Sequence, residues 1–228
     1  MKKKIGSFIL SIAMFVLVVP QAFAFGDSNS DMENWVNENE NEIRENFSAL
    51  GIDENVQNNL IKKLQDGKQI DSMKQANLDK ALQQLDTISV GESKTLTFDD
   101  GSKILFGSEK VEDKESAIVP FISAGSYQVK SYWYMGLLNA SYLTDFVIVS
   151  GANNDYIVSS HSESVSIIGG SYSNVNLSTP RKYETSSRLA YSRLYFDYSV
   201  PTGSARFNLY FHVGDNDYNT ALSLNDIK

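Results

Sequence analysis

The sequence predicts a mainly β protein, an antiparallel β-sandwich or alternatively a barrel, preceded by two to three short helices. From residue 93 onward, apolar and polar residues alternate with a period of two, which is typical of half-buried strands. Turn-forming clusters, such as those at 151–154 and at Gly169-Gly170, recur between these segments. Short strands separated by turns favour an all-β architecture. We therefore expect an acidic helical region at 25–90 and a Tyr/Ser-rich antiparallel β-domain at 93–228.

Residues 1–24 have the features of a secretory signal peptide. Lysines occupy positions 2–4, an apolar run covers 8–19, and Ala22-Phe23-Ala24 is a small-x-small cleavage site. The apolar run is shorter than the ~20 residues that span a bilayer. We expect cleavage after Ala24 and a secreted, extracellular protein. The chain is cysteine-free, which excludes disulfides, thiol catalysis and Cys-based zinc sites.

The helical region contains start and stop signals for two helices. Asp31 and Gly51 delimit the first helix, and Asp53 and Gly67 delimit the second. The first helix has its apolar residues at Val36, Ile43, Phe47 and Leu50. A third helix is predicted around 78–85. We expect these helices to pack on the β-domain, with a mobile N-terminal arm as the alternative.

Two β-hairpins can be predicted, one around the turn Asp99-Asp100-Gly101 and a second over 194–213. In the second hairpin, even-numbered residues up to Val200 and odd-numbered residues from Ala205 onward are apolar. Cross-strand partners share a face, so an even position must oppose an odd one. Pairing Val200 with Ala205 satisfies this condition and places Phe196 opposite Leu209. The loop within 201–204 is then predicted to have two or four residues.

The outward face of this second hairpin is the main candidate binding surface. The predicted register places Arg193 opposite His212 and Tyr195 opposite Tyr210. Tyrosine rings beside guanidinium groups form a rigid amphipathic surface, which suits sugar faces, peptide backbones or aromatic partners. The alternative interpretation is an ordinary solvated sheet face, because tyrosine favours strands. The candidate residues of this surface are Tyr195, Tyr210, Arg193, Arg206 and His212. Tyr132 and Tyr134, on another predicted strand, would extend it.

Catalytic signals are weak. His161 lies among serines at 159–164, but a Ser–His–Asp/Glu triad needs a nucleophile on an exposed elbow and an oxyanion hole. No Gly-x-Ser-x-Gly motif is present, and alternating serines are typical of a polar strand edge. Asp145 lies on a predicted strand without a recognisable second carboxylate for glycosidase chemistry. We predict no catalytic residue and leave enzymatic activity as a disfavoured alternative.

A calcium site is a further weak candidate. Asp215, Asp217 and Asn219 have the spacing that opens a calcium loop, but Thr220 replaces the central glycine and Asp226 replaces the glutamate. Turn chemistry explains these residues more simply. We predict no bound metal and no cofactor.

Charge disfavours two classes of partner. The formal net charge is −8, and no cluster of Lys and Arg is available to neutralise nucleic-acid phosphates or anionic lipid. The Ser-rich stretch 157–179 resembles in composition the hairpins that toxins insert into membranes. Its lipid-facing row would include Ile157, Val165, Ile167, Val175 and Leu177, but Ser159, His161 and Glu163 interrupt this row. Ordinary edge strands fit the stretch as well.

Several segments resemble a family of uncharacterised secreted proteins of Gram-positive bacteria. Leu-Gly-Ile at 50–52, Leu-Ile-Lys-Lys-Leu at 60–64 and Asp-Ser-Met at 71–73 are similar to a short helical segment of that family. Residues 126–134 and 182–187 are similar to the β-domain of unknown function that often follows it. The resemblance implies an exported protein with a helical segment before a β-domain, and it transfers no catalytic residue.

Three functional hypotheses follow. The first is a secreted non-enzymatic protein that binds a cell-wall polymer, glycan or protein through the Tyr/Arg sheet face. The second is a secreted toxin or bacteriocin-like effector that acts on membranes. The third is an unrecognised extracellular hydrolase. The oligomeric state is not specified by the sequence.

Overall fold

The computed structural model describes residues 29–74, 76–78, 87–89, 91–111, 124–151, 153–200 and 203–221. The predicted signal peptide and its cleavage site lie outside these residues. The described elements are α1 (Asn29–Ala49), α2 (Glu54–Gln65), the 3-10 helix η1 (Asp71–Met73), β1 (Thr87–Ser89), β2 (Ser93–Thr97), β3 (Lys103–Lys110), β4 (Gly125–Tyr134), β5 (Leu138–Ile148), β6 (Tyr156–Ile167), β7 (Ser171–Arg181), β8 (Ala190–Val200), β9 (Gly203–Gly214) and β10 (Asp217–Ala221).

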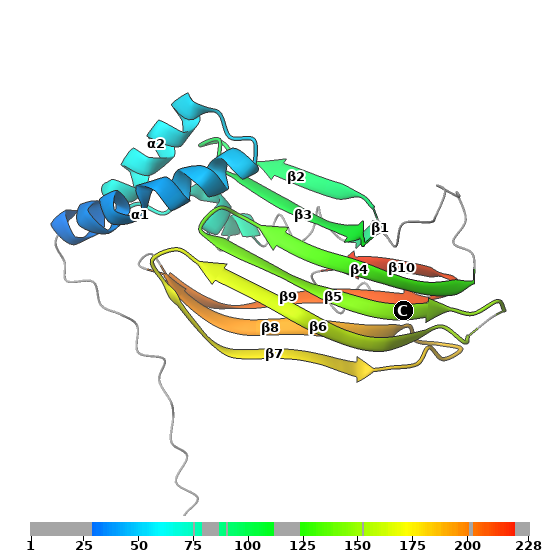
Figure 1. Ribbon diagram of the computed structural model, residues 1–228. Coiled ribbons are helices and arrows are strands. Elements are labelled where there is room, and N and C mark those ends of the chain that lie inside the picture. The colour runs from blue at the N-terminus through cyan, green and yellow to red at the C-terminus, as the bar shows by residue number, and fades with distance from the viewer. Residues whose placement is uncertain are drawn as a thin grey trace, which may run out of the picture.

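The strands form two antiparallel sheets. One sheet, here called the β5 sheet, has the order β2-β3-β4-β5-β6, and the other, the β8 sheet, has the order β1-β10-β9-β8-β7. The two sheets lie face to face in Figure 1. They do not close into a barrel, so the β-sandwich prediction is confirmed and the barrel alternative is wrong.

Aromatic side chains from both sheets fill the space between them. The Phe146 ring of β5 lies 5.0 Å from the Phe211 ring of β9, and the Trp133 ring of β4 lies 5.6 Å from the Phe207 ring. Phe146, Trp133 and Phe211 are almost completely buried. Such pairs add packing energy to the burial of large apolar surfaces. The predicted inward positions of β8 and β9 therefore do face the core.

The register of the β8–β9 hairpin differs from the detailed pairing expected. Val200 pairs with Gly203, Phe196 with Phe207 and Tyr198 with Ala205, so the two-residue loop is confirmed and the four-residue register is wrong. A shift of two residues along one strand keeps every side chain on the same face, because the side-chain period is two.

Helices α1 and α2 agree closely with the sequence pattern. The predicted stripe of α1 is buried, and Asp53 caps α2 by accepting hydrogen bonds from the backbone N–H groups of Asn55 and Val56 at 3.1 Å each. Helix α1 begins at Asn29, so Asp31 lies in its first turn rather than at its cap. Most of the predicted third helix falls outside the described residues. Strand β1 lies within the range expected to be helical, where it pairs with β10.

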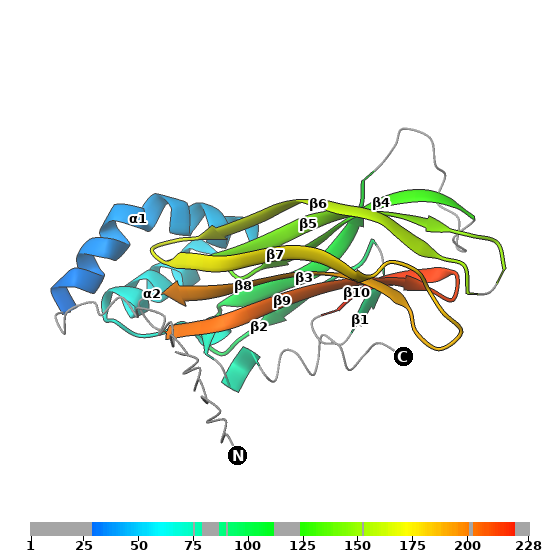
Figure 2. The ribbon, with the colours of Figure 1, turned by 90° about the horizontal axis from the view of Figure 1, so that it is seen from below.

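The helices close one end of the sandwich, as Figures 1 and 2 show. Asn46 of α1 donates a 2.8 Å hydrogen bond to the backbone oxygen of Gly136, in the β4–β5 connection. The Trp35 ring lies directly over Gly169, in the β6–β7 connection, where an added Cβ would come within 1.6 Å of the indole nitrogen. The helical region therefore packs on the β-domain, the first of the two expected arrangements. No helix in the described part of the chain is long and apolar enough to cross a membrane.

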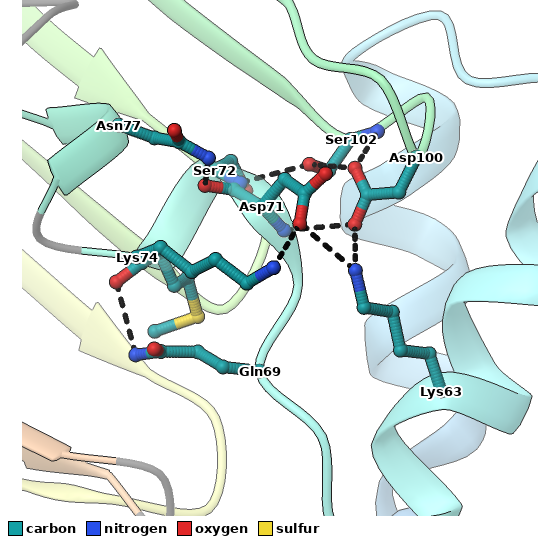
Figure 3. Close-up of polar contacts among 9 residues, drawn as sticks. Lys63, Gln69, Asp71, Ser72, Lys74, Asn77, Asp100 and Ser102 are labelled. Carbon is teal, nitrogen blue, oxygen red and sulfur yellow. Dashed lines mark hydrogen bonds and ion pairs between the residues drawn. The ribbon is translucent and has the colours of Figure 1, made fainter.

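A polar clamp, formed by Lys63, Asp71, Asp100 and Ser102, joins α2 and η1 to the β2–β3 turn (Figure 3). The Lys63 ammonium lies 2.9 Å from Asp71 and 2.8 Å from Asp100. Asp100 also accepts hydrogen bonds from the backbone N–H of Asp71 at 2.8 Å and from the Ser102 hydroxyl at 2.6 Å. Burial opposes ionisation of Asp100, but these hydrogen bonds outweigh it and hold the pKa of Asp100 below its ordinary value.

Candidate functional site

An Arg–Tyr stripe, formed by Arg181, Tyr191, Arg193, Tyr195 and Arg206, lies on the outward face of the β8 sheet. The Arg181 guanidinium lies 5.2 Å from the centre of the Tyr191 ring. The guanidinium groups of Arg193 and Arg206 lie 4.5 and 5.3 Å from the centre of the Tyr195 ring. Cation–π contacts at these distances hold flexible arginines in place. Three strands, β7, β8 and β9, thus contribute to one ordered surface.

The observed register changes the neighbours expected within this surface. Arg193 pairs with Tyr210 rather than with His212, and Tyr195 pairs with Asn208 rather than with Tyr210. Both corrections follow from the two-residue shift of the hairpin. Arg193, Tyr195 and Arg206 still share the outward face, as expected. Arg181 and Tyr191, which pair between β7 and β8, extend the surface beyond the residues that the sequence indicated.

Tyr210 and His212 do not contribute an accessible surface. Tyr210 is 5% exposed and His212 is 0% exposed. Burial, together with the nearby Arg181 charge, lowers the pKa of His212 to about 3. His212 is therefore neutral near pH 7. The accessible part of the candidate surface is smaller than predicted and lies around Arg193, Tyr195 and Arg206.

Tyr132 and Tyr134 belong to a different surface. They lie on β4, in the β5 sheet, where their rings stack 5.1 Å apart. Their neighbours Ser131 and Trp133 point into the core; the Ser131 hydroxyl, for example, lies 2.9 Å from that of Thr220 in the β8 sheet. The two tyrosines therefore face outward on the opposite side of the sandwich. The expected extension of the Tyr/Arg surface through them is wrong.

The charges of the Arg–Tyr stripe are unequally compensated. Arg206 forms two hydrogen bonds with Asp197, at 2.7 and 3.0 Å, and these hold the pKa of the Asp197 carboxyl below its ordinary value. Within the described part of the chain, neither Arg181 nor Arg193 has a carboxylate partner. From 171 to 214 the sequence has five basic and two acidic residues. This region is therefore positively charged in a protein whose net charge is −8.

A second polar network lies on the outward face of the β5 sheet. Asp145 on β5 accepts hydrogen bonds from Gln128 and Ser159, each at 2.7 Å, and lies 2.9 Å from the Nε2 atom of His161. The His161 Nδ1 atom is in turn 2.9 Å from the hydroxyl of Ser162. Asp145 therefore has partners that the sequence did not reveal. It faces a histidine and serines, not the second carboxylate that glycosidase chemistry needs.

The calcium candidates form a hairpin turn. Asp215 and Asn216 have φ values of 57° and 58°, while Asp217 already pairs with Gly214. Such a two-residue turn with two left-handed residues joins β9 to β10, and Asn219 lies within β10. A twelve-residue calcium loop is therefore not formed. Among the residues that the structure describes, no group of three or more His, Cys, Asp or Glu could hold a metal ion.

This turn is held by a carboxylate lock formed by Asp155 and Glu184. The backbone N–H of Asp215 donates to Glu184 at 2.6 Å, and that of Asn216 donates to Asp155 at 2.9 Å. Both acidic side chains are buried. Burial, with the nearby Glu184 and Asp215 charges, raises the pKa of Asp155 despite its backbone hydrogen bonds.

The row considered for membrane insertion faces the core for most of its length. Ile157 is fully buried. Val165, Ile167 and Leu177 pack against the core, whereas Val175 is 38% exposed. Most of these apolar side chains therefore contribute to the core of the sandwich.

Fold and surface together define a helix-capped antiparallel β-sandwich with an Arg–Tyr stripe on one sheet. No protein-family model matches the chain, and no curated protein matches it. A crystal structure of the hypothetical protein lmo2686 from Listeria monocytogenes EGD-e is similar over 61% of this chain and 96% of that chain, with 18% identity and a TM-score of 0.36. This is a distant likeness to a hypothetical protein, and it carries no argument about function.

Proposed function

We propose that this protein is exported and binds an anionic cell-wall glycan through the Arg–Tyr stripe. The observation that supports the proposal most directly is Arg193, whose guanidinium is stacked on Tyr195 and has no carboxylate partner among the described residues. Guanidinium groups bind phosphate and carboxylate oxygens through paired N–H donors. An ordered arginine that has no counter-ion within the described ranges is thus well suited to a ligand anion.

The tyrosines support a carbohydrate ligand. Tyr191 and Tyr195 are four residues apart on the same face of β8, so they lie ~13 Å from each other along the strand. Both remain partly accessible. The two rigid rings offer apolar faces to separate sugar units of one glycan chain, while Arg181 and Arg193 offer charge. The positive region on an otherwise acidic protein also favours an anionic partner over a neutral one.

Export is the second part of the proposal, and it is supported by the basic, apolar and small-x-small pattern of residues 1–24. Expression in a Gram-positive host should place the protein outside the membrane, in the wall fraction or the medium, with Phe25 as its first residue, as amino-terminal sequencing would show. Protein retained in the cells at full length would contradict this part.

Binding can be tested by sedimenting the exported protein with isolated cell walls. Arg193→Gln and Tyr195→Ala should each weaken retention about tenfold, which corresponds to ~1.4 kcal/mol. The matched control is Arg44→Gln, which removes the same charge on helix α1, outside the stripe, where Arg44 is paired with Glu40. Retention should also fall with added salt.

Walls from which the anionic polymers have been extracted supply the second arm of the test. Loss of retention on extracted walls supports an anionic glycan. Equal retention of the parent protein and all three variants, or retention that does not depend on salt or on the anionic polymers, would reject the proposal.

A further inference from the structure

The network around Asp145 contains a hydrogen-bond chain with a defined direction. Asp145 accepts hydrogen bonds from Gln128, Ser159 and His161. Burial opposes ionisation, but these three contacts outweigh it and hold the pKa of Asp145 below its ordinary value. The ionised carboxylate can only accept, so the Nε2 atom of His161 must carry a proton.

The protonation of Nε2 determines the role of the other ring nitrogen. A neutral imidazole has one donor and one acceptor nitrogen, so Nδ1 of His161 carries the lone pair. The Ser162 hydroxyl, 2.9 Å away, is therefore the donor in this contact. The chain runs from the Ser162 O–H through His161 to Asp145, which is the arrangement that activates serine nucleophiles.

A β-bulge brings Ser162 to the histidine. On β5, Ser141 pairs with Ser164 and Leu143 with His161, so Ser162 and Glu163 together oppose a single residue of β5. In a regular strand, consecutive side chains point to opposite faces. The bulge re-aims the Ser162 hydroxyl so that it reaches the ring of the preceding residue, as bulges beside active sites do.

The backbone of Ser162 is also strained. Its φ is 56°, in the left-handed region where a bulge of this kind usually has glycine. A non-glycine residue in this region costs ~1–2 kcal/mol. Strain of this kind is concentrated at functional sites, and here it coincides with the one hydroxyl that donates to His161.

We propose that Ser162 is a reactive serine that takes an acyl group from an activated ester, with His161 as general base and Asp145 as the residue that positions it. The Ser162 oxygen forms a bond to the acyl carbon while the bond from that carbon to the leaving oxygen breaks. The serine proton moves to Nδ1 of His161 and then to the leaving oxygen or water. The product is an acyl ester of Ser162.

The exposure of the network limits the substrate class. The His161 side chain is 41% exposed and that of Asp145 is 32% exposed, so an ester in solution can reach the hydroxyl. Water also reaches the site and weakens any stabilisation of the developing oxyanion. Esters with a good leaving group, such as aryl esters, are therefore the expected donors, and amides are not.

The test uses p-nitrophenyl acetate and the full exported protein. Nitrophenolate release gives the rate, and peptide mass spectrometry locates the acetyl group. Ser162 should be acetylated about 100-fold faster than Ser164, the matched control on the same strand, because a positioned general base contributes ~10²–10⁴-fold. His161→Gln should reduce the Ser162 rate to that of Ser164.

Two further variants separate reactivity from structure. Ser162→Gly should abolish acetylation at this position yet leave the thermal midpoint unchanged or higher, because glycine adopts positive φ without strain. Asp145→Asn removes the carboxylate that accepts the Nε2 proton of His161 and fixes its tautomer, so it should lower the acetylation rate of Ser162 and leave that of Ser164 unchanged. Acetylation of Ser162 no faster than that of Ser164, or unchanged in folded His161→Gln, would overturn the proposal. The binding proposal would be unaffected, because the stripe lies on the opposite sheet.

Discussion

The two ends of the sandwich use carboxylates in different ways. At the helix-capped end, Asp71 and Asp100 of the polar clamp face Lys63 at 2.9 and 2.8 Å. At the opposite end, the carboxylate lock of Asp155 and Glu184 faces backbone N–H groups. The contact with Lys74, followed by that with Lys63, lowers the pKa of Asp71, and the hydrogen bonds of the clamp lower the pKa of Asp100 despite its burial, whereas burial near other acids raises the pKa of Asp155. Aspartate side chains at the two ends therefore respond to pH in opposite directions.

The two ends also differ in the kind of contact that stabilises them. The helical end combines the clamp with buried apolar contacts, such as Phe47 of α1 against Gly136. The opposite end relies on hydrogen bonds within its turns. We expect the helical end to lose the most stability when an apolar residue is removed.

The largest predicted effect is that of Phe47→Ala. Phe47 is 1% exposed, and truncation of a buried phenylalanine costs ~3–5 kcal/mol. The control is Tyr183→Ala at the other end, where the side chain is 60% exposed and the expected change is within ~0.5 kcal/mol. Urea unfolding followed by far-UV circular dichroism measures both. A loss below ~1 kcal/mol for Phe47→Ala would show that the cap contributes little.

The second prediction concerns the clamp. Lys63→Met leaves Asp71 and Asp100 close together without their shared cation, and the expected cost is ~2 kcal/mol, because these groups are only partly buried. Lys74→Met is the control: Lys74 also contacts Asp71, but its side chain is 46% exposed, so we expect less than ~1 kcal/mol. Equal losses of unfolding free energy for the two variants would mean that Lys63 in the clamp stabilises the fold no more than the exposed Lys74 does.

The third prediction uses pH to distinguish the two ends. Asp100 has a folded-state pKa below 3.8, so its stabilisation is complete above that value and is lost as the pH falls through the folded-state pKa. Asp155 has a folded-state pKa above 3.8, so its ionisation is penalised in the fold near pH 7. That penalty is relieved as the pH falls through the raised pKa toward 3.8.

Two asparagine variants report these opposite trends. As the pH falls from 7 toward 4, the stability of the parent protein should rise relative to that of Asp155→Asn. Below pH 3.8, the difference in unfolding free energy between the parent protein and Asp100→Asn should become smaller. Chemical unfolding at a series of pH values measures both differences, and parallel curves for the two variants would contradict the contrast between the ends.

The smallest predicted effect lies on the β8 sheet, away from either end. Arg206→Ala breaks the contact with Asp197, but the side chains of Arg206 and Asp197 are 57% and 31% exposed. Ion pairs in water contribute little to stability. The urea midpoint should therefore stay within experimental error, and a clear shift would show that the stripe supports the fold as well as a ligand.

Alternation along the chain was sufficient to predict the sandwich and the faces of β8 and β9. It could not determine the register, because pairings that differ by two residues place the same side chains inside. Val200 opposite Gly203 and Val200 opposite Ala205 are equally consistent with the pattern.

The candidate sites were less predictable. Alternation assigns Tyr210 and His212 to the outward face, but it does not show that this part of the face is buried. The Asp145–His161 contact depends on the pairing of β5 with β6 and on a bulge, neither of which leaves a periodic signal. A histidine within a serine-rich strand was the only local indication, and it identified His161 without its partner.

The register shifts have a consequence for how the protein behaves at high concentration. Strand β6 forms one edge of the β5 sheet and β7 forms one edge of the β8 sheet, and both contain shifts, between Ser141/Leu143 on the β5–β6 pair and between Ser173/Asn176 on the β7–β8 pair. An uninterrupted terminal strand is a template on which another chain can add a strand. The register shifts in β6 and β7 break the regular row of backbone donors and acceptors at these two edges, and so they oppose the addition of further strands there.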